Sequence, residues 1–170
     1  MADKFYIAYG SNLSIEQMAY RTPDAKIVGT AMLKGWRLLF RQYATVKKSA
    51  NFETPVLIWK ISAHDEKNLD RYEGFPKFYG KKNLKVAVTS LDGENLGEIT
   101  AMIYIMTKKA VEMREKNPLP SGSYFSILSK GYDTFGFNKN ILERAFNESF
   151  WRTLKPESQI IRRASRPTTA

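Results

Sequence analysis

The order of strand-like and helix-like segments is the feature that most constrains the fold of this chain. Apolar, β-branched stretches dominate its first part, a helical pattern follows at residues 62–73, two strands are indicated within 84–106, and the remainder is helical in pattern. A doubly wound parallel sheet needs a helix between successive strands. Because that rhythm is missing, we predict an α+β fold with a small curved or barrel-like, mixed or antiparallel sheet and surrounding helices.

The size of the chain indicates one domain. A length of 170 residues with 43% hydrophobic content suits a single compact core. We expect this domain to span residues 1–155, with its last helix ending at Lys155-Pro156. Residues 156–170 are expected to form a basic tail that is mobile or contacts a partner. With no leader pattern and no apolar run near the roughly 18 residues that cross a bilayer, we expect a cytoplasmic protein without a membrane partner.

Local signals predict where several elements begin and end. Ser14 and Gln17 have capping-box spacing and open a short helix. Residues 26–46 are expected to form one or two strands, interrupted near Gly35. The turn signal Asp92-Gly93-Glu94-Asn95 lies between two apolar, alternating stretches, which predicts an antiparallel hairpin.

The segment Tyr9-Gly10-Ser11-Asn12-Leu13 lies between an apolar strand pattern and a helix pattern. Glycine lets a backbone approach a ligand closely, and short polar side chains and N–H groups at a helix start suit a carboxylate or a polarised carbonyl. The spacing is not that of a phosphate loop. The segment therefore predicts either a ligand cradle or an ordinary capped turn.

Composition narrows the chemistry that the chain can perform. It contains no cysteine and one histidine, His64. Disulfides, thiolate ligands, a cysteine nucleophile and any metal site built on several histidines are therefore excluded. Because Ser62 and Asp65 resemble a capping pair, His64 is expected to be an exposed residue in the first turn of a helix.

The formal net charge of +10 raises the possibility of a nucleic-acid partner. The basic residues, however, occur in small separate groups, without one long basic block or a recognisable nucleic-acid module. These groups are Lys47-Lys48, Lys81-Lys82, Lys108-Lys109 and Arg162-Arg163. We therefore expect a solvated basic surface rather than a nucleic-acid-binding protein.

Glu73 is the carboxylate with the strongest sequence case for catalysis. It lies next to Gly74, a helix stop signal, within an aromatic-rich segment that includes Tyr72, Phe75 and Phe78. Desolvation by aromatic side chains and the negative end of the helix dipole both raise the pKa of a carboxyl group. The alternative is an exposed glutamate in a turn.

Three motifs together resemble the gamma-glutamylcyclotransferase-like family, which includes AIG2-like proteins. They are Tyr9-Gly10-Ser11-Asn12-Leu13, Leu69-Asp70-Arg71-Tyr72-Glu73-Gly74 and Pro120-Ser121-Gly122-Ser123-Tyr124. Their order and approximate separation match, and the resemblance extends from about Phe5 to Phe137. The first two motifs are the more specific.

The resemblance implies cyclisation of a gamma-glutamyl amide or dipeptide to 5-oxoproline, with release of an amine or amino acid. The substrate's own α-amine attacks its γ-carbonyl, so no cofactor or metal is implied, and the partner is a small gamma-glutamyl molecule. Glu73 is the implied general acid and base. Residues 9–13 are expected to bind the glutamyl part, and the hydroxyl of Tyr124 to close the pocket. Tyr9 and Tyr124 have the alternative role of packing in the core.

One departure from the family pattern leaves the leaving group open. Gly80-Lys81-Lys82-Asn83 replaces an arginine-containing run, and Phe75, Phe78 and Tyr79 suggest an apolar amine. Arg71 and Lys81 are weaker candidates for attracting an anion.

The sequence leaves three other functions open. A noncatalytic binding or regulatory module of the same fold is the main alternative. The second alternative is a basic nucleic-acid-binding protein. A glycosidase using Asp70 and Glu73 is last, because no sugar-binding pattern accompanies that pair.

Overall fold

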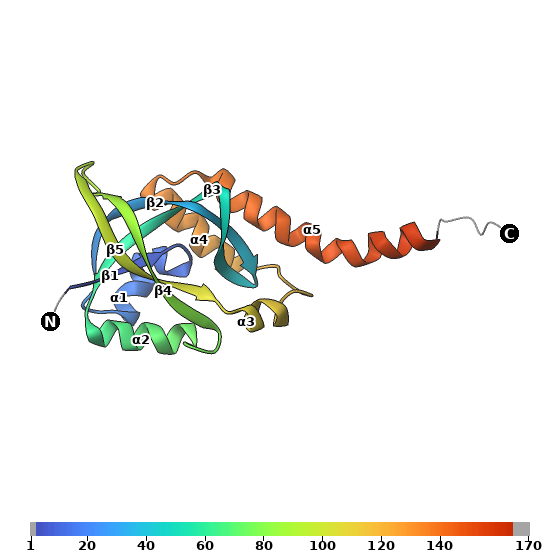
Figure 1. Ribbon diagram of the computed structural model, residues 1–170, viewed down its shortest axis with the longest axis horizontal. Helices are drawn as coiled ribbons and strands as arrows, with labels where there is room; N and C mark the ends of the chain where they lie inside the picture. The colour runs from blue at the N-terminus through green and yellow to red at the C-terminus, as the bar shows by residue number, and fades with distance from the viewer. Residues whose placement is uncertain (1–2, 165–170) are drawn as a thin grey trace.

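The computed structural model describes residues 3–164, with side chains to residue 154, and its centre is a closed five-stranded barrel (Figure 1). Around the barrel the strands follow one another as β1 (Lys4–Ala8), β3 (Tyr43–Ile61), β2 (Lys26–Arg41), β4 (Tyr79–Thr89) and β5 (Asn95–Met106). A parallel pairing of β5 with β1 closes the ring, and the other pairs are antiparallel. The predicted α+β fold with a barrel-like mixed sheet is confirmed.

The long β2–β3 hairpin is the largest part of the barrel. Its register runs from Lys26↔Lys60 to Arg41↔Tyr43, and the chain reverses at Gln42, which has φ 64°. The predicted interruption near Gly35 is a bulge with φ 79°, after which the strand continues. A glycine with positive φ can add one residue to a strand without ending its hydrogen-bonded pairing. In the sequence, such a bulge looks the same as a turn that ends the strand.

The predicted hairpin of β4 and β5 is confirmed. The register runs from Tyr79↔Met106 to Thr89↔Asn95, with the turn at residues 90–94. Both strands begin earlier in the chain than the alternating stretches that predicted them. Pairing with a neighbouring strand satisfies the main-chain hydrogen-bonding groups of a residue whatever its side chain is.

The helices surround the barrel, with α2 along its lower side and α5 projecting away from it (Figure 1). They are η1 (Ser11–Leu13), α1 (Ile15–Arg21), α2 (Ala63–Glu73), α3 (Lys108–Met113), α4 (Gly122–Phe135) and α5 (Lys139–Ala164). Ser14, Ser62 and Ser121 each cap a helix start by accepting a main-chain N–H in their side chain, so the predicted starts are confirmed. The short α3 was not predicted.

The prediction that the last helix ends at Lys155-Pro156 is wrong, because α5 continues to Ala164. A proline removes one main-chain donor and crowds the preceding turn, yet the other hydrogen bonds of a long helix persist. Of the expected tail, residues 156–164 thus continue α5, and residues 165–170 lie outside the described part of the chain.

The core fills the barrel and the space beneath the helices. Ile7, Leu57 and Ile103 are fully buried on adjacent strands, and Phe40 of β2 packs on Phe125 of α4 with ring centroids 6.1 Å apart. The Phe40–Phe125 contact holds α4 on the barrel, and α4 also packs on η1, the turn that follows β1 and borders the candidate site. None of the described helices has an apolar stretch long enough to span a membrane.

Candidate active site

A pocket of about 430 Å³ opens where the turn after β1, the end of α2 and the start of α4 meet. Gly10, Ser11 and Asn12 line one wall, Glu73 lies at the end of α2, and Tyr124 contributes from α4. Three motifs that are far apart in the sequence therefore share one cavity. Their order along the chain did not require this.

Glu73 is placed by the way in which α2 ends. Gly74 adopts the left-handed conformation with φ 63°. Its N–H donates to Arg71 O, and Phe75 N–H donates to Asp70 O, the pattern of a Schellman cap. A Cβ at residue 74 would also lie 2.5 Å from Phe78 Cδ2, so glycine is needed for space as well as for φ. This cap fixes the last helical residue, Glu73, at the pocket.

The carboxylate of Glu73 is desolvated in the pocket. Burial raises its pKa from 4.5 to about 7, although the nearby guanidinium of Arg21 acts in the opposite direction. The direction agrees with the sequence prediction. Oε1 accepts a hydrogen bond from Asn12 Nδ2 at 3.4 Å. A carboxyl group with a pKa near neutrality can both take up and return a proton.

Asn12 holds the turn and the carboxylate in one hydrogen-bonded network. It is 3% exposed, its Nδ2 also donates to the Tyr6 hydroxyl at 2.8 Å, and its Oδ1 accepts from Arg21 Nη1 at 2.7 Å. Trp59 Nε1 donates to its main-chain oxygen at 3.1 Å. Because donors and acceptors on both sides are used, the amide has one orientation in the pocket.

Arg21 is the cation closest to this network. Besides Asn12, it donates to Ser11 Oγ at 3.3 Å, and its guanidinium lies 3.5 Å from the centre of the Tyr72 ring. The planar guanidinium can stack and donate at once, which a lysine ammonium cannot do. Arg21 therefore fixes the turn and gives the pocket positive charge.

The main-chain N–H groups of the turn remain available. Leu13 N donates to Gly10 O and Ser14 N donates to Ser11 O, both at 3.0 Å. Among the described residues, none accepts a hydrogen bond from the main-chain N–H of residues 10–12. Unpaired donors beside a cavity can bind an anion or a developing oxyanion.

Tyr124 approaches the turn from α4. Its hydroxyl accepts a hydrogen bond from Ala44 N at 3.0 Å, and its ring packs edge-to-face on Tyr43 at 5.3 Å. A Cβ on Gly10 would lie 3.2 Å from that hydroxyl. Gly10 thus leaves the space in which the Tyr124 hydroxyl reaches the pocket.

Tyr9 and Leu13, the two ends of the predicted cradle, differ in position. Tyr9 lines the pocket and is 6% exposed, with its hydroxyl donating to Tyr104 O at 2.6 Å. Leu13 lies in the core and does not line the pocket; its side chain packs against Gly131, where a Cβ would come within 2.7 Å of it. Within the predicted segment, residues 9–12 face the cavity and residue 13 anchors them.

The other candidate side chains separate into two groups. Arg71, Phe78 and Tyr79 line the pocket. Lys81 lies elsewhere, since its Nζ pairs with Glu66 at 2.8 Å and with Asp70 at 2.6 Å. It also lies 4.4 Å from the ring of Phe75, which does not line the pocket.

Asp70 is not part of the candidate site. It accepts a hydrogen bond from the Tyr104 hydroxyl at 2.5 Å in addition to its pairing with Lys81. Glu73 is therefore the one carboxylate among the described residues that line the pocket. The paired carboxylates that a glycosidase needs are not brought together.

Several residues of the pocket were not among the candidates from the sequence, including Tyr6, Arg21 and Arg114. Tyr6 is a buried strand residue, and the two arginines end short helices, where a basic side chain is ordinary. No local signal distinguishes them. Among the described residues, no group of three His, Asp or Glu side chains forms a cluster suited to a metal ion.

Comparison with known proteins places the same residues inside one family match. The family model described as "Gamma-glutamyl cyclotransferase, AIG2-like" matches residues 6–126, a span that contains Tyr9, Glu73 and Tyr124. Human gamma-glutamylcyclotransferase is 30% identical over 138 residues, which cover 74% of this chain and 68% of the human protein. The mouse protein of that name is 27% identical over 151 residues, covering 82% of this chain and 75% of its own.

A solved structure gives the same result for the fold. The structure titled "Gamma-glutamyl cyclotransferase" superposes with a TM-score of 0.67 at 27% identity. The superposition covers 85% of this chain and 86% of the other. The likeness therefore extends over most of both chains.

Proposed function

This chain belongs to the gamma-glutamyl cyclotransferase, AIG2-like family, and we propose that it cyclises a gamma-glutamyl amide or dipeptide to 5-oxoproline with Glu73 as general acid and base. The observation that carries the proposal is the half-buried Glu73 carboxylate, with a pKa of about 7, facing a pocket shared with residues 9–12. A base is most effective when its pKa lies close to the working pH. The family match alone would leave the catalytic group open.

The reaction needs one group that moves a proton. The substrate's α-amine nitrogen attacks its γ-carbonyl carbon, forming the C–N bond of a five-membered ring, and the original amide C–N bond breaks. Glu73 takes a proton from the α-ammonium group and gives a proton to the departing nitrogen; the ring nitrogen loses its second proton as the lactam forms, and the released amine takes up that proton in water. General acid–base catalysis contributes roughly 10²–10⁴-fold. Holding the amine against the carbonyl adds to this, because the two reacting groups already belong to one molecule.

The turn after β1 is suited to bind the glutamyl part. The unpaired N–H groups of residues 10–12 offer donors to an α-carboxylate or to the oxyanion that forms on the γ-carbonyl. Asn12 and Arg21 are held by each other at 2.7 Å, so both are positioned before a substrate arrives. Preorganised donors stabilise charge without reorganising during the reaction.

The opposite wall of the pocket favours a leaving group that carries a carboxylate. Arg114 lies 5.4 Å from the ring centres of Tyr43 and Phe78, and no described carboxylate forms an ion pair with it. Arg71 adds a second positive charge to the lining. We therefore favour an amino acid over the apolar amine that Phe75, Phe78 and Tyr79 suggested.

The test measures 5-oxoproline released from gamma-glutamylalanine and from an apolar gamma-glutamylamine. We expect release from the first, and a loss on the order of 10²–10⁴-fold in Glu73→Gln. Glu98→Gln, an exposed change of the same kind on β5, serves as the matched control and is expected to keep full activity. Circular dichroism of both variants checks that they remain folded.

Two results would contradict the proposal in different ways. Full activity in folded Glu73→Gln would remove Glu73 from catalysis while leaving the reaction. Binding of gamma-glutamyl compounds without any 5-oxoproline would indicate the noncatalytic module instead. A preference for the apolar amine would overturn only the assignment of the leaving group.

A further inference from the structure

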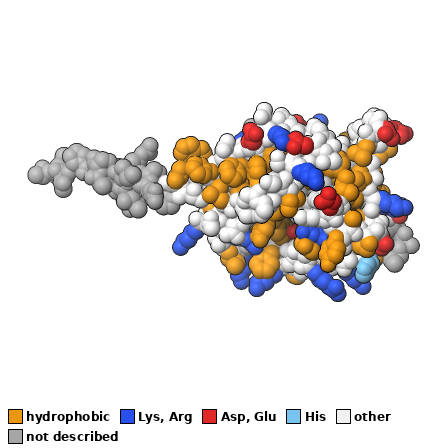
Figure 2. Space-filling model, turned by 180° about the vertical axis from the view of Figure 1, so that it is seen from behind, with side chains coloured by type: hydrophobic (Ala, Val, Ile, Leu, Met, Phe, Trp, Pro, Cys, Tyr) orange, Lys and Arg blue, Asp and Glu red, His pale blue; other side chains and the backbone are white. Residues whose placement is uncertain are grey.

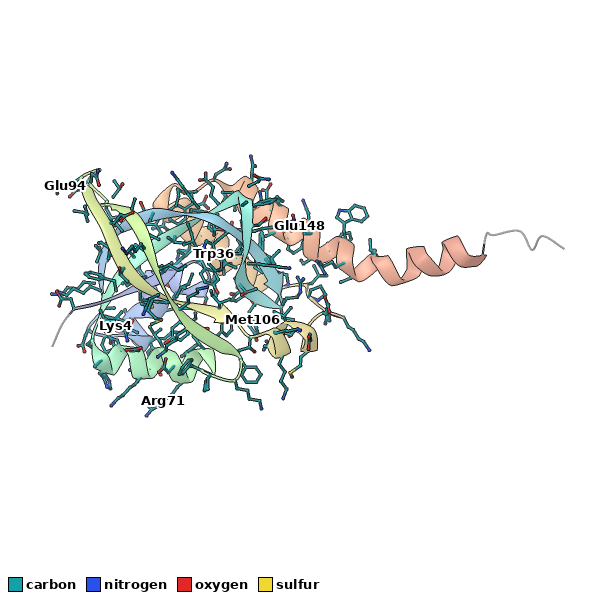
Figure 3. All side chains as sticks on the ribbon, viewed as in Figure 1. Lys4, Trp36, Arg71, Glu94, Met106 and Glu148 are labelled. Carbon is teal, nitrogen blue, oxygen red and sulfur yellow. The ribbon has the colours of Figure 1, made fainter. Side chains whose placement is uncertain are left out.

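A second and larger hollow lies away from the Glu73 pocket and shares no lining residue with it. This groove, of about 1140 Å³, runs along the β2–β3 hairpin and is bounded by α3 and α5. Figure 3 labels Trp36, Met106 and Glu148, which lie along it. Nothing in the cyclisation reaction uses these residues, so the groove needs an explanation of its own.

The groove is strongly basic. Seven cationic side chains line it, and they are Arg37, Arg41, Lys47, Lys48, Lys82, Lys108 and Arg152. Three carboxylates are present, of which Glu148 pairs with Arg37 and Glu115 with Arg152. The surplus of positive charge favours an anionic ligand.

Four lysines of the groove are free to meet such a ligand. Lys47, Lys48, Lys82 and Lys108 are exposed, and none forms an ion pair with another described residue. They come from three of the small basic groups that the sequence spreads over β3, β4 and α3. The scattered distribution argued against a polyanion, but folding gathers these lysines around one hollow.

Arg41 at the floor of the groove is a second and independent observation. It is 5% exposed, and its Nη1 donates to Phe40 O at 2.7 Å. Its Nε is buried without a hydrogen-bond partner among the described residues. A buried charge with an unmet donor is costly, because the group has lost its water. Glu115 and Glu148 act on this charge, but neither forms an ion pair with Arg41. An anion bound in the groove would compensate the remaining positive charge at this position.

Aromatic side chains add a stacking surface to this charge. Trp151 of α5 lies at the groove and is 63% exposed, an unusual position for a large indole. Lys82 Nζ lies 5.6 Å from the Trp36 ring on the other side. Figure 2 shows hydrophobic side chains gathered on α5 next to the part drawn in grey. Exposed aromatics among cations are the combination that binds single-stranded nucleic acid.

We propose that this groove binds single-stranded nucleic acid, with backbone phosphates on the exposed lysines Lys47, Lys48, Lys82 and Lys108, the charge of Arg41 beneath them, and a base stacked on Trp151. An acidic peptide would use the lysines but not the exposed indole, so the indole decides between the two partners. The proposal goes beyond the cyclisation of gamma-glutamyl compounds and does not depend on it.

The first experiment titrates the full chain into fluorescein-labelled 12-nucleotide U-rich RNA and the matching DNA, and follows fluorescence anisotropy. With about four phosphate contacts, the logarithm of the affinity should fall with the logarithm of salt concentration with a slope of about −3. An abasic strand of equal charge should bind at least about fivefold more weakly, since stacking of one base contributes that much. Inorganic polyphosphate and polyglutamate of equal charge serve as competitors.

Variants locate the binding. Lys47→Glu with Lys48→Glu should weaken affinity at least about tenfold at 0.1 M salt and halve the slope. Lys67→Glu with Lys85→Glu makes the same change of charge at exposed positions outside the groove, and its affinity should fall less than about threefold. The Trp151→Ala variant should bind the normal strand at least about fivefold more weakly than the wild type does, and should bind the normal and abasic strands with equal affinity.

The proposal is overturned if no anisotropy change occurs at 0.05 M salt, or if the control pair weakens binding as much as the groove pair. Equal competition by polyphosphate and polyglutamate, together with an unaffected Trp151→Ala, would also overturn it. That result would describe a surface for any polyanion.

Discussion

The Glu73 pocket and the basic groove both combine arginines with aromatic rings, but they use their charges differently. In the pocket, Arg21 is bound to Asn12 and Ser11 and stacked on Tyr72, around a single carboxylate. In the groove, four exposed lysines have no ion pair with the described residues, and the donors of Arg41 are incompletely used.

This difference matches the two kinds of ligand. Chemistry on one small molecule needs groups held in one geometry before the ligand arrives. A flexible polymer tolerates long, mobile lysines, because its affinity depends on the number of phosphates neutralised. The two proposals together predict that cations held by internal hydrogen bonds serve the reaction and that exposed, unpaired cations serve the polyanion.

The pH dependence of stability tests the pocket most strongly. The pKa of Glu73 is raised from 4.5 to about 7, so the folded chain holds this proton more tightly than the unfolded chain. The contribution of Glu73 to stability should therefore fall as pH rises through this interval and change no further above it. Glu73→Gln should exceed the wild type by about 3 kcal/mol near pH 8 and match it near pH 4.

Urea unfolding of both chains at the two pH values measures this effect. Glu98→Gln, at an exposed position, is the control and should show no such difference. An equal stability gap at both pH values would show that Glu73 does not titrate with a raised pKa.

Removing Arg21 should break the fixed geometry of the pocket. In Arg21→Ala, Asn12 and Ser11 lose their donor, and misplacement of the turn by about 1 Å is expected to lower kcat/KM about 10²-fold. Steady-state release of 5-oxoproline measures this. Arg21→Lys should recover little, because an ammonium cannot donate and stack as the guanidinium does. Full recovery by lysine would mean that only the charge matters.

Gly74→Ala tests whether the helix cap positions Glu73. Alanine at φ 63° with its Cβ 2.5 Å from Phe78 should cost about 2 kcal/mol of stability. Thermal unfolding measures the loss. Gly93→Ala is the control, since φ there is also positive at 90° but nothing lies within 4 Å of the added Cβ. A loss no larger than the control's would show that contact with Phe78 does not constrain the cap.

The smallest effect on 5-oxoproline release is expected from changes in the basic groove, which is separate from the Glu73 pocket. Lys47→Glu with Lys48→Glu should leave kcat/KM for 5-oxoproline release within about twofold of the wild type, because the groove shares no lining residue with the pocket. Comparing kinetics at two salt concentrations checks this. A change above tenfold at both would mean that the two regions are coupled.

Local elements were the part of the fold most accessible to sequence. The starts of α1, α2 and α4 follow from Ser14, Ser62 and Ser121, because a cap acts on the next few residues only. The interruption predicted near Gly35 is a bulge rather than a strand end, and the helix end predicted at Lys155-Pro156 is wrong, since the outcome at both places depends on hydrogen bonds to partners that the local pattern does not specify.

The candidate site was predictable to the extent that its motifs are local. Residues 9–12, Glu73 and Tyr124 line one pocket, whereas Leu13 packs in the core. Arg21 and Arg114 join the pocket only through folding, as do the lysines of the groove. The sequence around a charged residue does not show which distant residues will lie beside it in the folded chain.

The sequence by itself determined the α+β class, the main helix starts and the candidate acid–base residue, because capping, periodicity and motif spacing act over short stretches of chain. Tertiary structure decided that the barrel closes through β1 and β5, that Asn12 meets Glu73, and that separate basic groups form one groove. These are contacts between residues far apart in the chain. Their formation depends on the packing of the whole core, which no local pattern encodes.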